Sequence, residues 1–485
     1  MRLIVGPFNR VEGDLEVALD IADGRVVSAQ VNSPLYRGFE QIMQGRDPSD
    51  ALVIAPRICG ICSVSQSAAA ASALAAAMKL EMPANGRLAQ NLTLACENLA
   101  DHFSHFYLFF MPDFAREAYR DRAWFPQAQA RFKAISGSAA QQALPARADF
   151  LHLMAYLAGK WPHTLSIQPG GSAKGVEAAE KARMLAVIHQ FRRFLEQTLF
   201  GDRLETVAAL DSAAALQAWM DARPAGTGDF RLFLEISRDL QLQRLGRATD
   251  RFMSYGSYPF ESSHLFRPGV WQGKLQDQWQ ALDPAAIAED VSHSLMSGPQ
   301  EPLPPASGLT LPLEEKAGAY SWCKAPRLAG EVMETGALAR QMVQGHPLIR
   351  DLAAQSGGNV QNRIIARLLE FALVIPAMEN WAKELKPGEP FCLHGKMPDE
   401  IRSFGLVEAA RGSLGHWLHV SAGRIFNYQI IAPTTWNFSP RDASETPGAL
   451  EQALVGAPVL PGEDTPLAVQ HIVRSFDPCM VCTVH

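Results

Sequence analysis

Long apolar runs are missing from the sequence. Hydrophobic residues make up 47% of the 485 residues, but no stretch approaches the roughly 18 consecutive apolar residues that a membrane-spanning helix needs. Met1 leads into a polar, strand-like segment that does not resemble a signal peptide. We therefore expect no direct insertion into a membrane.

Positive charge and cysteine are also scarce. The net charge is -6 and no basic block occurs, which argues against nucleic acid as a partner. The seven cysteines are odd in number and irregularly spaced, unlike the framework of a secreted disulfide-rich domain. The sequence also has no Walker loop and no G-x-G-x-x-G. A reducing compartment therefore fits the chain better than secretion.

Four of the cysteines form two C-x-x-C pairs near opposite ends of the chain. Cys59 and Cys62 lie in R-I-C-G-I-C, and Cys479 and Cys482 lie in F-D-P-C-M-V-C-T-V-H. Their thiolates suit nickel, iron, copper(I) or zinc. A zinc ribbon closes its pairs within about 15 to 20 residues, whereas these pairs are more than 400 residues apart. A buried catalytic metal is the favoured hypothesis, with structural zinc and two unrelated pairs as alternatives.

Hydrophobic periodicity predicts a mainly helical α+β fold with a small sheet. Residues 1–36 alternate apolar and polar around a short turn, which is typical of an antiparallel hairpin. Residues 87–111 and 173–200 show helical spacing, and we expect both in a central bundle of long helices. We treat residues 1–485 as a single domain in which the two ends of the chain meet at the metal.

Two further predictions concern the second half of the chain. A helix is expected over about 359–385, interrupted at Pro376. The segment 298–313 is rich in proline and glycine and is predicted to be a long surface loop. Neither feature marks a certain domain boundary.

Several isolated polar residues have an ordinary structural interpretation. Glu12 is consistent with a solvated charge at a strand end, and His102 and His105 with packing inside a helical bundle. Arg411 lies between small residues beside apolar sequence, so it needs an acceptor if it is buried. Residue patterns alone assign none of these four to a site.

Taken together, the motifs resemble those of one family. R-x-C-G-x-C and D-P-C-x-x-C-x-x-H at the two ends are accompanied by R-V-E-G, R-G-F-E, H-F-S-H-F-Y, G-K-W-P-H, K-A-P-R and P-T-T-W-N. In this order they resemble the large subunit of a nickel-iron hydrogenase, from Asn9 to His485. The resemblance implies that fold and the heterolytic cleavage of H2 into protons and electrons.

The resemblance implies a nickel-iron centre. The four paired cysteines match the thiolates that hold nickel, with Cys62 and Cys482 bridging to an iron that carries cyanide and carbon monoxide. Arg411 and Thr434 match residues that hydrogen-bond the cyanides. Ala410 stands beside Arg411, where many relatives have proline.

It also implies a route for protons. Cys479 matches a terminal thiolate, which is a suitable base. Glu12 matches the glutamate that first relays protons, and a buried carboxylate with a pKa near neutrality can do this. Asp101 and Asp477 match carboxylates close to Arg411.

A magnesium-like ion is implied near the centre. Glu40, the backbone carbonyl near Ile430, and His485 match its ligands. In many relatives an extension that follows this histidine is removed once nickel is inserted. The sequence ends on His485, so we expect no such cleavage.

Electrons require a second polypeptide. Beyond the four paired cysteines, three isolated ones remain, too few for a four-cysteine iron-sulfur cluster: Cys96, Cys323 and Cys392. A partner small subunit bearing iron-sulfur clusters is therefore expected, in a heterodimer or a dimer of heterodimers.

One departure from the family pattern favours a particular branch. Gln66 stands where many relatives carry histidine, which replaces a titrating group with one that only hydrogen-bonds. With the compact length, this resembles the regulatory, H2-sensing branch, which signals to a histidine kinase and implies a cytoplasmic location. The alternatives are an uptake hydrogenase that feeds a respiratory chain and a cofactor-free structural relative. The four cysteines argue against the last.

Two bulky residues bear on gas access. Ile61 and Phe109 match positions that line the end of the family's gas channel, where smaller valine and leucine are common. A tightly packed interior relaxes little around an added methylene or ring. We therefore expect a narrow channel that admits H2 and slows O2.

Overall fold

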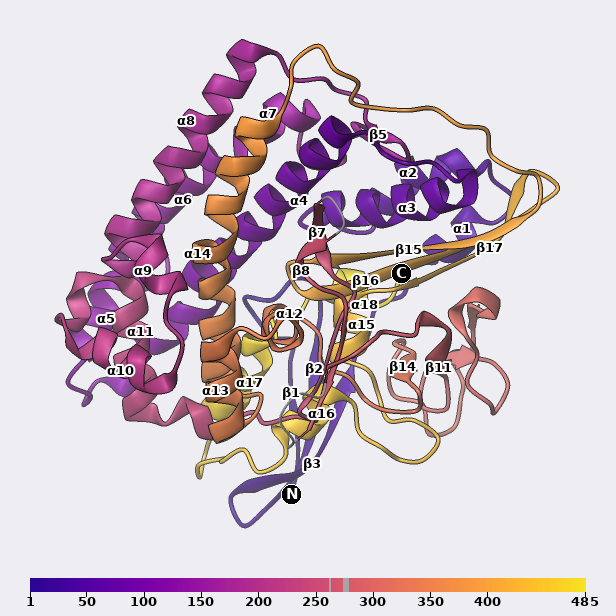
Figure 1. Ribbon diagram of the computed structural model, residues 1–485. Coiled ribbons are helices and arrows are strands. Elements are labelled where there is room, and N and C mark those ends of the chain that lie inside the picture. Colours follow the sequence, from indigo (N-terminus) through magenta and orange to yellow (C-terminus); the bar gives the residue numbers. More distant parts are fainter. Residues whose placement is uncertain (261–262, 274–278) are drawn as a thin grey trace.

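A bundle of long helices forms the core of the computed structural model, which describes residues 1–260, 263–273 and 279–485. Helices α4 (Ala84–Ser104) and α8 (Ala178–Phe194) both pack against α14 (Val360–Glu384). Figure 1 shows α14 running down the molecule, with α8 beside it. The predicted α+β fold with a central helix bundle is confirmed.

Shorter helices complete the helical part of the molecule. They are α1 (Phe39–Met43), α2 (Ala51–Ile54), α5 (Phe125–Phe132), α6 (Ser138–Leu151), α7 (Leu153–Ala158), α9 (Leu204–Ala208), α10 (Ala213–Asp221), α11 (Asp229–Leu240), α12 (Ala337–Gln344), α13 (Pro347–Ser356), α15 (Pro433–Asn437), α16 (Ala449–Leu454) and α17 (Leu467–Ser475). Two more lie at the cysteine pairs: α3 (Ser63–Met78) directly follows Cys62, and α18 (Met480–Thr483) begins after Cys479 and contains Cys482.

The two predicted bundle helices differ from the structure mainly at their ends. The helix expected over 87–111 is α4 followed by a π-helical turn, His105–Phe110. The helix expected over 173–200 begins later, at Ala178, and also ends in a π-helical turn. It begins there because the carboxylate of Glu180 accepts a hydrogen bond from the backbone N–H of Glu177 and so caps the first turn.

The predicted interruption at Pro376 is wrong. Helix α14 continues through Pro376 to Glu384. A proline inside a helix removes one hydrogen bond and crowds the preceding turn. Val374, Ile375 and Met378 are nevertheless fully buried around it, and their packing outweighs that local cost.

The N-terminal residues form the expected small antiparallel sheet. It contains β1 (Arg2–Val5), β2 (Glu16–Ala22) and β3 (Arg25–Asn32) in that order. The β2–β3 turn places Asp23 and Gly24 at φ of 51° and 70°, as a tight hairpin turn requires. The sheet confirms the predicted hairpin and adds one strand to it.

A second sheet near the C-terminal end was not predicted. Strands β15 (Ile401–Ala409), β16 (Gly412–Ser421) and β17 (Arg424–Ile431) form an antiparallel meander that packs against the alanine-rich helix α3. At Gly405 a Cβ atom would lie only 2.2 Å from the carbonyl oxygen of Ala69. Small residues on both elements therefore permit the close approach.

The remaining described strands are short and paired. They are β4 (Ile167–Gln168) with β5 (Gly171–Ser172), β9 (Gly269–Gln272) between β6 (Arg251–Ser254) and β10 (Trp279–Gln280), β7 (Ser257–Phe260) with β8 (Ser263–Phe266), β11 (Ile287–Asp290) with β14 (Ala325–Leu328), and β12 (Met296–Ser297) with β13 (Leu311–Pro312). The last pair closes the base of the proline-rich segment 298–313, which is otherwise a loop with one 3-10 turn.

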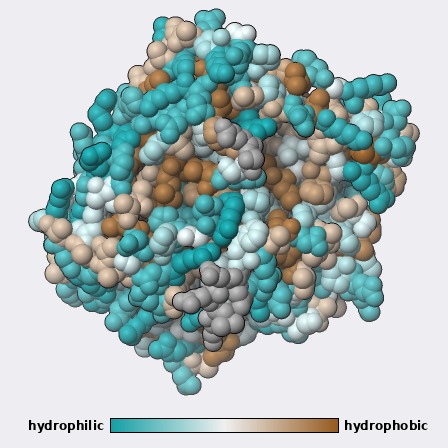
Figure 2. Space-filling model, in the orientation of Figure 1, coloured by the Kyte–Doolittle hydropathy of each residue, from teal (hydrophilic) through white to brown (hydrophobic). Residues whose placement is uncertain are grey.

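The surface is mixed in character. On the face shown in Figure 2, hydrophilic residues predominate and hydrophobic ones gather around the middle of the view. Among the described residues, no helix has both the length and the apolar character needed to cross a membrane.

Candidate metal centre

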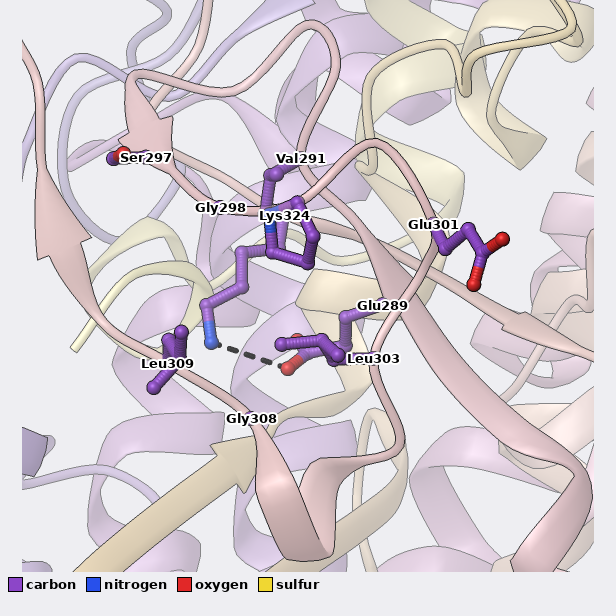
Figure 3. A pocket seen from close by; sticks show the side chains of 10 residues that line it. Glu289, Val291, Ser297, Gly298, Glu301, Leu303, Gly308, Leu309 and Lys324 are labelled. Atoms are coloured by element: carbon purple, nitrogen blue, oxygen red, sulfur yellow. Dashed lines mark hydrogen bonds and ion pairs between the residues drawn. The ribbon is translucent and has the colours of Figure 1, made fainter.

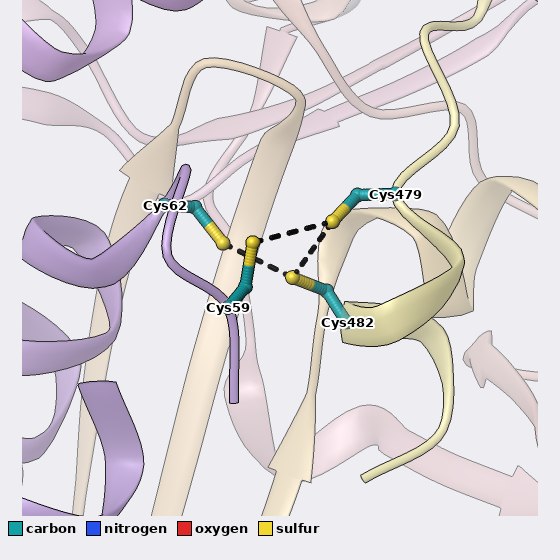
Figure 4. Close-up of side chains that lie close together, drawn as sticks. All are labelled: Cys59, Cys62, Cys479 and Cys482. Carbon is teal, nitrogen blue, oxygen red and sulfur yellow. Dashed lines mark hydrogen bonds between the residues drawn. The ribbon is translucent and has the colours of Figure 1, made fainter. Parts of the chain in front are cut away.

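The four paired cysteines meet inside the protein. The sulfur atoms of Cys59 and Cys479 are 3.6 Å apart, and those of Cys62 and Cys482 are 3.0 Å apart. All four sulfurs lie within 4.8 Å of one another. Figure 4 shows the side chains converging from two segments, one before α3 and one at α18. The two ends of the chain thus come together as expected.

A third segment holds the second pair in place. The backbone N–H of Met480 donates to the carbonyl oxygen of Glu12 at 2.7 Å, and the N–H of Glu12 donates to the carbonyl of Pro478 at 3.4 Å. Glu12 therefore pairs, strand-like, with Cys479. The N-terminal R-V-E-G segment is part of the site because of this backbone pairing.

The donor set fits a thiophilic metal. Hydrogen bonds from the other three sulfurs lower the pKa of Cys59 well below its usual value, whereas they and burial raise the pKa of Cys62. Burial also raises the pKa of Cys482. A cluster of buried thiols that share protons in this way releases them when a soft metal binds. Nickel and iron are such metals, and magnesium and calcium are not.

Arg411 is buried beside the cysteines with two carboxylates as acceptors. Its guanidinium donates to Asp101 at 2.6 Å, to the side chain of Asp477 at 3.1 Å and to the backbone carbonyl of Asp477 at 2.9 Å. The two carboxylates differ in their acidity. Burial raises the pKa of Asp101 to about 7. Burial acts in the same direction on Asp477, but Arg411, His105 and Arg367 outweigh it and lower the pKa to about 2.

Three more of the predicted residues lie in the same region. Burial and the negative charge on Cys59 raise the pKa of Glu12, which is half-buried. The hydroxyl of Thr434 accepts a hydrogen bond from the N–H of Cys479 at 3.2 Å. Ala410 is buried and accepts from Arg340 through its carbonyl at 3.0 Å. A carboxylate with a raised pKa beside a thiolate cluster is suited to carry protons.

Glu40, Ile430 and His485 also come together, as the resemblance implied. The Glu40 carboxylate accepts from the N–H of Ile430 at 2.7 Å, and Nε2 of His485 donates to the carbonyl of Ile430 at 2.7 Å. Burial would raise the pKa of Glu40, but Lys324 and His485 lower it to about 2. As metal ligands, these oxygen atoms and the imidazole suit a hard cation with bound water.

Two charged residues beside Glu40 were missed from the sequence. The ammonium group of Lys324 lies 3.1 Å from Glu289 and 3.9 Å from Glu40. Figure 3 shows Lys324 and Glu289 facing each other across a small pocket. A neighbouring cavity of about 20 Å³ is lined by Glu40, Lys324 and His485, enough for about one water molecule. Lys324 belongs to the quoted K-A-P-R motif, whereas Glu289 has no local sequence signal.

Gln66 is held by a buried chain of hydrogen bonds. Its side-chain oxygen lies 2.8 Å from Nε2 of His416, whose Nδ1 lies 2.8 Å from the hydroxyl of Tyr428. Burial lowers the pKa of His416 to about 3. The imidazole therefore stays neutral and donates to Gln66.

The histidines of α4 and its extension are packed as expected. Nε2 of His102 lies 2.9 Å from Glu370, and Nε2 of His105 lies 2.6 Å from the carbonyl oxygen of Arg474. Ile61 and Phe109 are both partly buried, and the carbonyl of Phe109 accepts from Arg10 at 3.1 Å.

Comparison with known proteins identifies the family. A family model described as nickel-dependent hydrogenase matches residues 37–141 and 128–485. The chain belongs to this family. The cysteine cluster is where such a hydrogenase needs its metal, and the prediction that the chain is a hydrogenase is confirmed.

Named hydrogenase subunits match along almost their whole length. The periplasmic NiFeSe hydrogenase large subunit of Desulfomicrobium baculatum is 29% identical, with 100% of this chain and 95% of that protein covered. The uptake hydrogenase large subunit of Azotobacter chroococcum mcd 1 is 26% identical over 100% of this chain and 95% of its own length. The reduced Ni-Fe-Se hydrogenase of D. vulgaris Hildenborough superposes with a TM-score of 0.85 at 30% identity, covering both chains completely.

Proposed function

We propose that this chain is the catalytic large subunit of a hydrogenase that oxidises H2 in an uptake role. The observation that carries the proposal is the convergence of four buried cysteine sulfurs within 4.8 Å. The relatives named as periplasmic and uptake enzymes support the uptake role. Although some of these relatives contain selenium by name, the four metal-facing positions in this chain are all cysteine.

A nickel-iron centre with cyanide and carbon monoxide on its iron would supply the redox-active metal pair that polarises H2. Cys59, Cys62, Cys479 and Cys482 would hold it. Arg411 presents a buried cation to anionic ligands there, and Thr434 adds a hydroxyl beside Cys479. Glu40, Ile430 and His485 would hold a magnesium ion nearby.

The proton route is argued from residues of this chain. The Cys479 sulfur is a base with a pKa raised by burial, so it binds a proton readily when ionised. Glu12 pairs with the backbone of Cys479 and is half-buried. A half-buried carboxylate beside the cluster can pass a proton outward. Asp101 and Asp477 keep Arg411 charged and oriented.

Electrons need a partner. The three cysteines outside the cluster are isolated, so a small subunit carrying iron-sulfur clusters would have to accept the electrons. The relatives' description as large subunits or large chains supports such a partner.

H2 sensing is a second candidate, and Gln66 favours it. Gln66 cannot titrate, and it is bonded to a histidine that stays neutral. This local chemistry suits a slow detector that signals to a histidine kinase in the cytoplasm. The named relatives favour uptake.

Purification of the protein with its native partners tests both roles. Nickel, together with cyanide and carbon monoxide bands in the infrared, is expected in either case, and its absence would end the proposal. Uptake predicts rapid H2 oxidation with an artificial acceptor and an electron-transfer partner. Sensing predicts slow turnover and a co-purifying kinase. Cell fractionation then decides the compartment.

A further inference from the structure

A buried carboxylate outside the cysteine cluster makes contact with the segment that carries Cys62. Glu97 lies on α4 with 2% of its surface exposed. Its oxygens accept from the backbone N–H of Val64 at 2.8 Å and of Ser65 at 2.9 Å. They also accept from the hydroxyl of Ser65 at 3.0 Å and from the indole N–H of Trp161 at 3.0 Å. No ion pair with a cation is found for Glu97 within the described ranges.

These bonds complete the start of helix α3. The first N–H groups of a helix have no partner within the helix, and the residue before it usually caps them with its side chain. In α3 that residue is Cys62, which makes no capping hydrogen bond, because its sulfur is turned toward the other cysteines. Glu97 supplies the missing acceptor from another helix.

The same carboxylate ties α3 to a partly exposed loop. Trp161 and His163 belong to the G-K-W-P-H motif. The N–H of His163 donates to the hydroxyl of Ser63 at 3.3 Å, and Nδ1 of His163 lies 2.9 Å from the carbonyl oxygen of Pro56. The loop therefore contacts the chain both before Cys59, at Pro56, and after Cys62, at Ser63. Glu97 accepts hydrogen bonds from this loop and from the start of α3.

We propose that Glu97 is a positioning residue: it fixes the backbone that follows Cys62 and thereby the place of the Cys62 sulfur at the metal centre. The inference rests on the proposed function of the cysteine cluster. The carboxylate acts through the helix start, since it accepts hydrogen bonds from residues that follow Cys62 and from Trp161.

The variant Glu97→Gln keeps the size of the side chain but replaces one of the two accepting carboxylate oxygens with an NH2 group. One backbone N–H then faces the amide NH2 and loses its partner. We expect roughly tenfold faster amide hydrogen exchange in the segment 59–70, the effect of leaving one buried N–H without its acceptor. In the loaded heterodimer we expect shifted carbon monoxide and cyanide bands, because Cys62 would be one of the four thiolates that hold the centre.

Glu451 provides a matched control. It is also buried, on α16, and it accepts from the N–H of Val31 at 3.0 Å and the hydroxyl of Tyr320 at 2.7 Å. Glu451→Gln should lower thermal stability but leave exchange in 59–70 and the infrared bands as in the wild type. A general loss of stability would change amide exchange in 59–70 and the infrared bands in both variants alike.

A milder variant covers the case in which Glu97→Gln does not fold. Ser65→Ala removes one hydroxyl donor to Glu97 and should shift both readouts in the same direction by a smaller amount. Wild-type exchange and wild-type bands in Glu97→Gln, or in Ser65→Ala where only that variant folds, would overturn the inference. A wild-type protein without nickel and without these bands would instead overturn the proposed function. Amide exchange in 59–70 would then still show whether Glu97 holds the start of α3.

Discussion

The backbone of Glu12 is paired with that of Cys479, through the 2.7 Å hydrogen bond from the N–H of Met480 to the Glu12 carbonyl. This pairing keeps Glu12 next to the cluster whatever its side chain carries. A change of its carboxylate to an amide should therefore leave the position of Cys479 intact. Proton transfer and metal assembly can be separated at this residue.

Glu12→Gln should retain nickel but lose proton exchange. An amide neither takes up nor releases a proton at neutral pH, and a positioned acid or base contributes about 100-fold or more to the rate. We expect exchange of deuterium between D2 and water to fall by at least that factor, while metal content stays at the wild-type level. Exchange at the wild-type rate would assign the relay to another group.

Cys62→Ser should abolish nickel binding. Replacing a thiolate with a hydroxyl removes a soft ligand, and we expect an affinity loss of more than about 100-fold because outer-shell changes alone cost about 10- to 100-fold. Metal analysis of the purified protein measures this. Cys96→Ser is the control, since Cys96 is also buried but lies outside the cysteine cluster, with its sulfur 3.7 Å from the carbonyl oxygen of Phe150. Equal nickel in both variants would contradict the site.

Glu451 should make stability fall as the pH rises. Burial raises its pKa from 4.5 to about 7 in the folded protein, so the folded state holds the proton more tightly than the unfolded state. The stabilisation that comes from this raised pKa is complete below pH 4.5, the pKa of the group in the unfolded chain, and is lost as the pH rises through about 7. Relative to Glu451→Gln, which cannot titrate, the wild type should lose on the order of 3 kcal/mol of unfolding free energy between pH 4.5 and pH 8.

Denaturant unfolding of both proteins across this pH range measures the difference. The unfolding free energy of the wild type minus that of the variant should be largest at acidic pH. This difference should fall as the pH rises toward 8. Parallel profiles would show that Glu451 has an ordinary pKa in the folded protein.

Ile61→Val combined with Phe109→Leu should make the protein more sensitive to O2. Both side chains are partly buried, and smaller ones open space in a tightly packed region. We expect faster inactivation under defined O2 and faster H2 oxidation. Ile54→Val, at another partly buried isoleucine packed against the same core, is the control. Unchanged inactivation with intact metals would place the protection elsewhere.

Local sequence patterns predicted the elements in which apolar and polar residues recur at a regular spacing. The alternation in residues 1–36 reflects one buried face of the N-terminal sheet. In residues 87–111 the large apolar side chains repeat at helical spacing, although α4 is buried on all sides from Asn91 to Phe103. Strand β16 is buried along nearly its whole length, so it shows no alternation and the sheet β15–β17 was missed. Pro376 was misjudged because its local effect is opposed by packing from residues distant in sequence.

The candidate site could be predicted only where a motif carries it. Spacing and residue type indicated the four cysteines, and resemblance indicated Glu40, Arg411 and His485. Glu97 could not be found in this way. It is a single acidic residue in an apolar helical stretch, and its partners come from a helix start and from a loop some 60 residues further on, whose Trp161 is 64 positions away.

The distance along the chain between the two halves of the cluster affects how the protein is made. Cys59 and Cys479 are separated by 420 positions, and translation proceeds at about 5 to 20 residues per second. The first pair of thiols therefore leaves the ribosome roughly 20 to 80 s before the second. During that interval Cys59 and Cys62 have no partners to share a metal. A centre that needs all four thiols can therefore be loaded only after translation. Until then, a cell that makes this protein has to keep Cys59 and Cys62 reduced and free of zinc or copper.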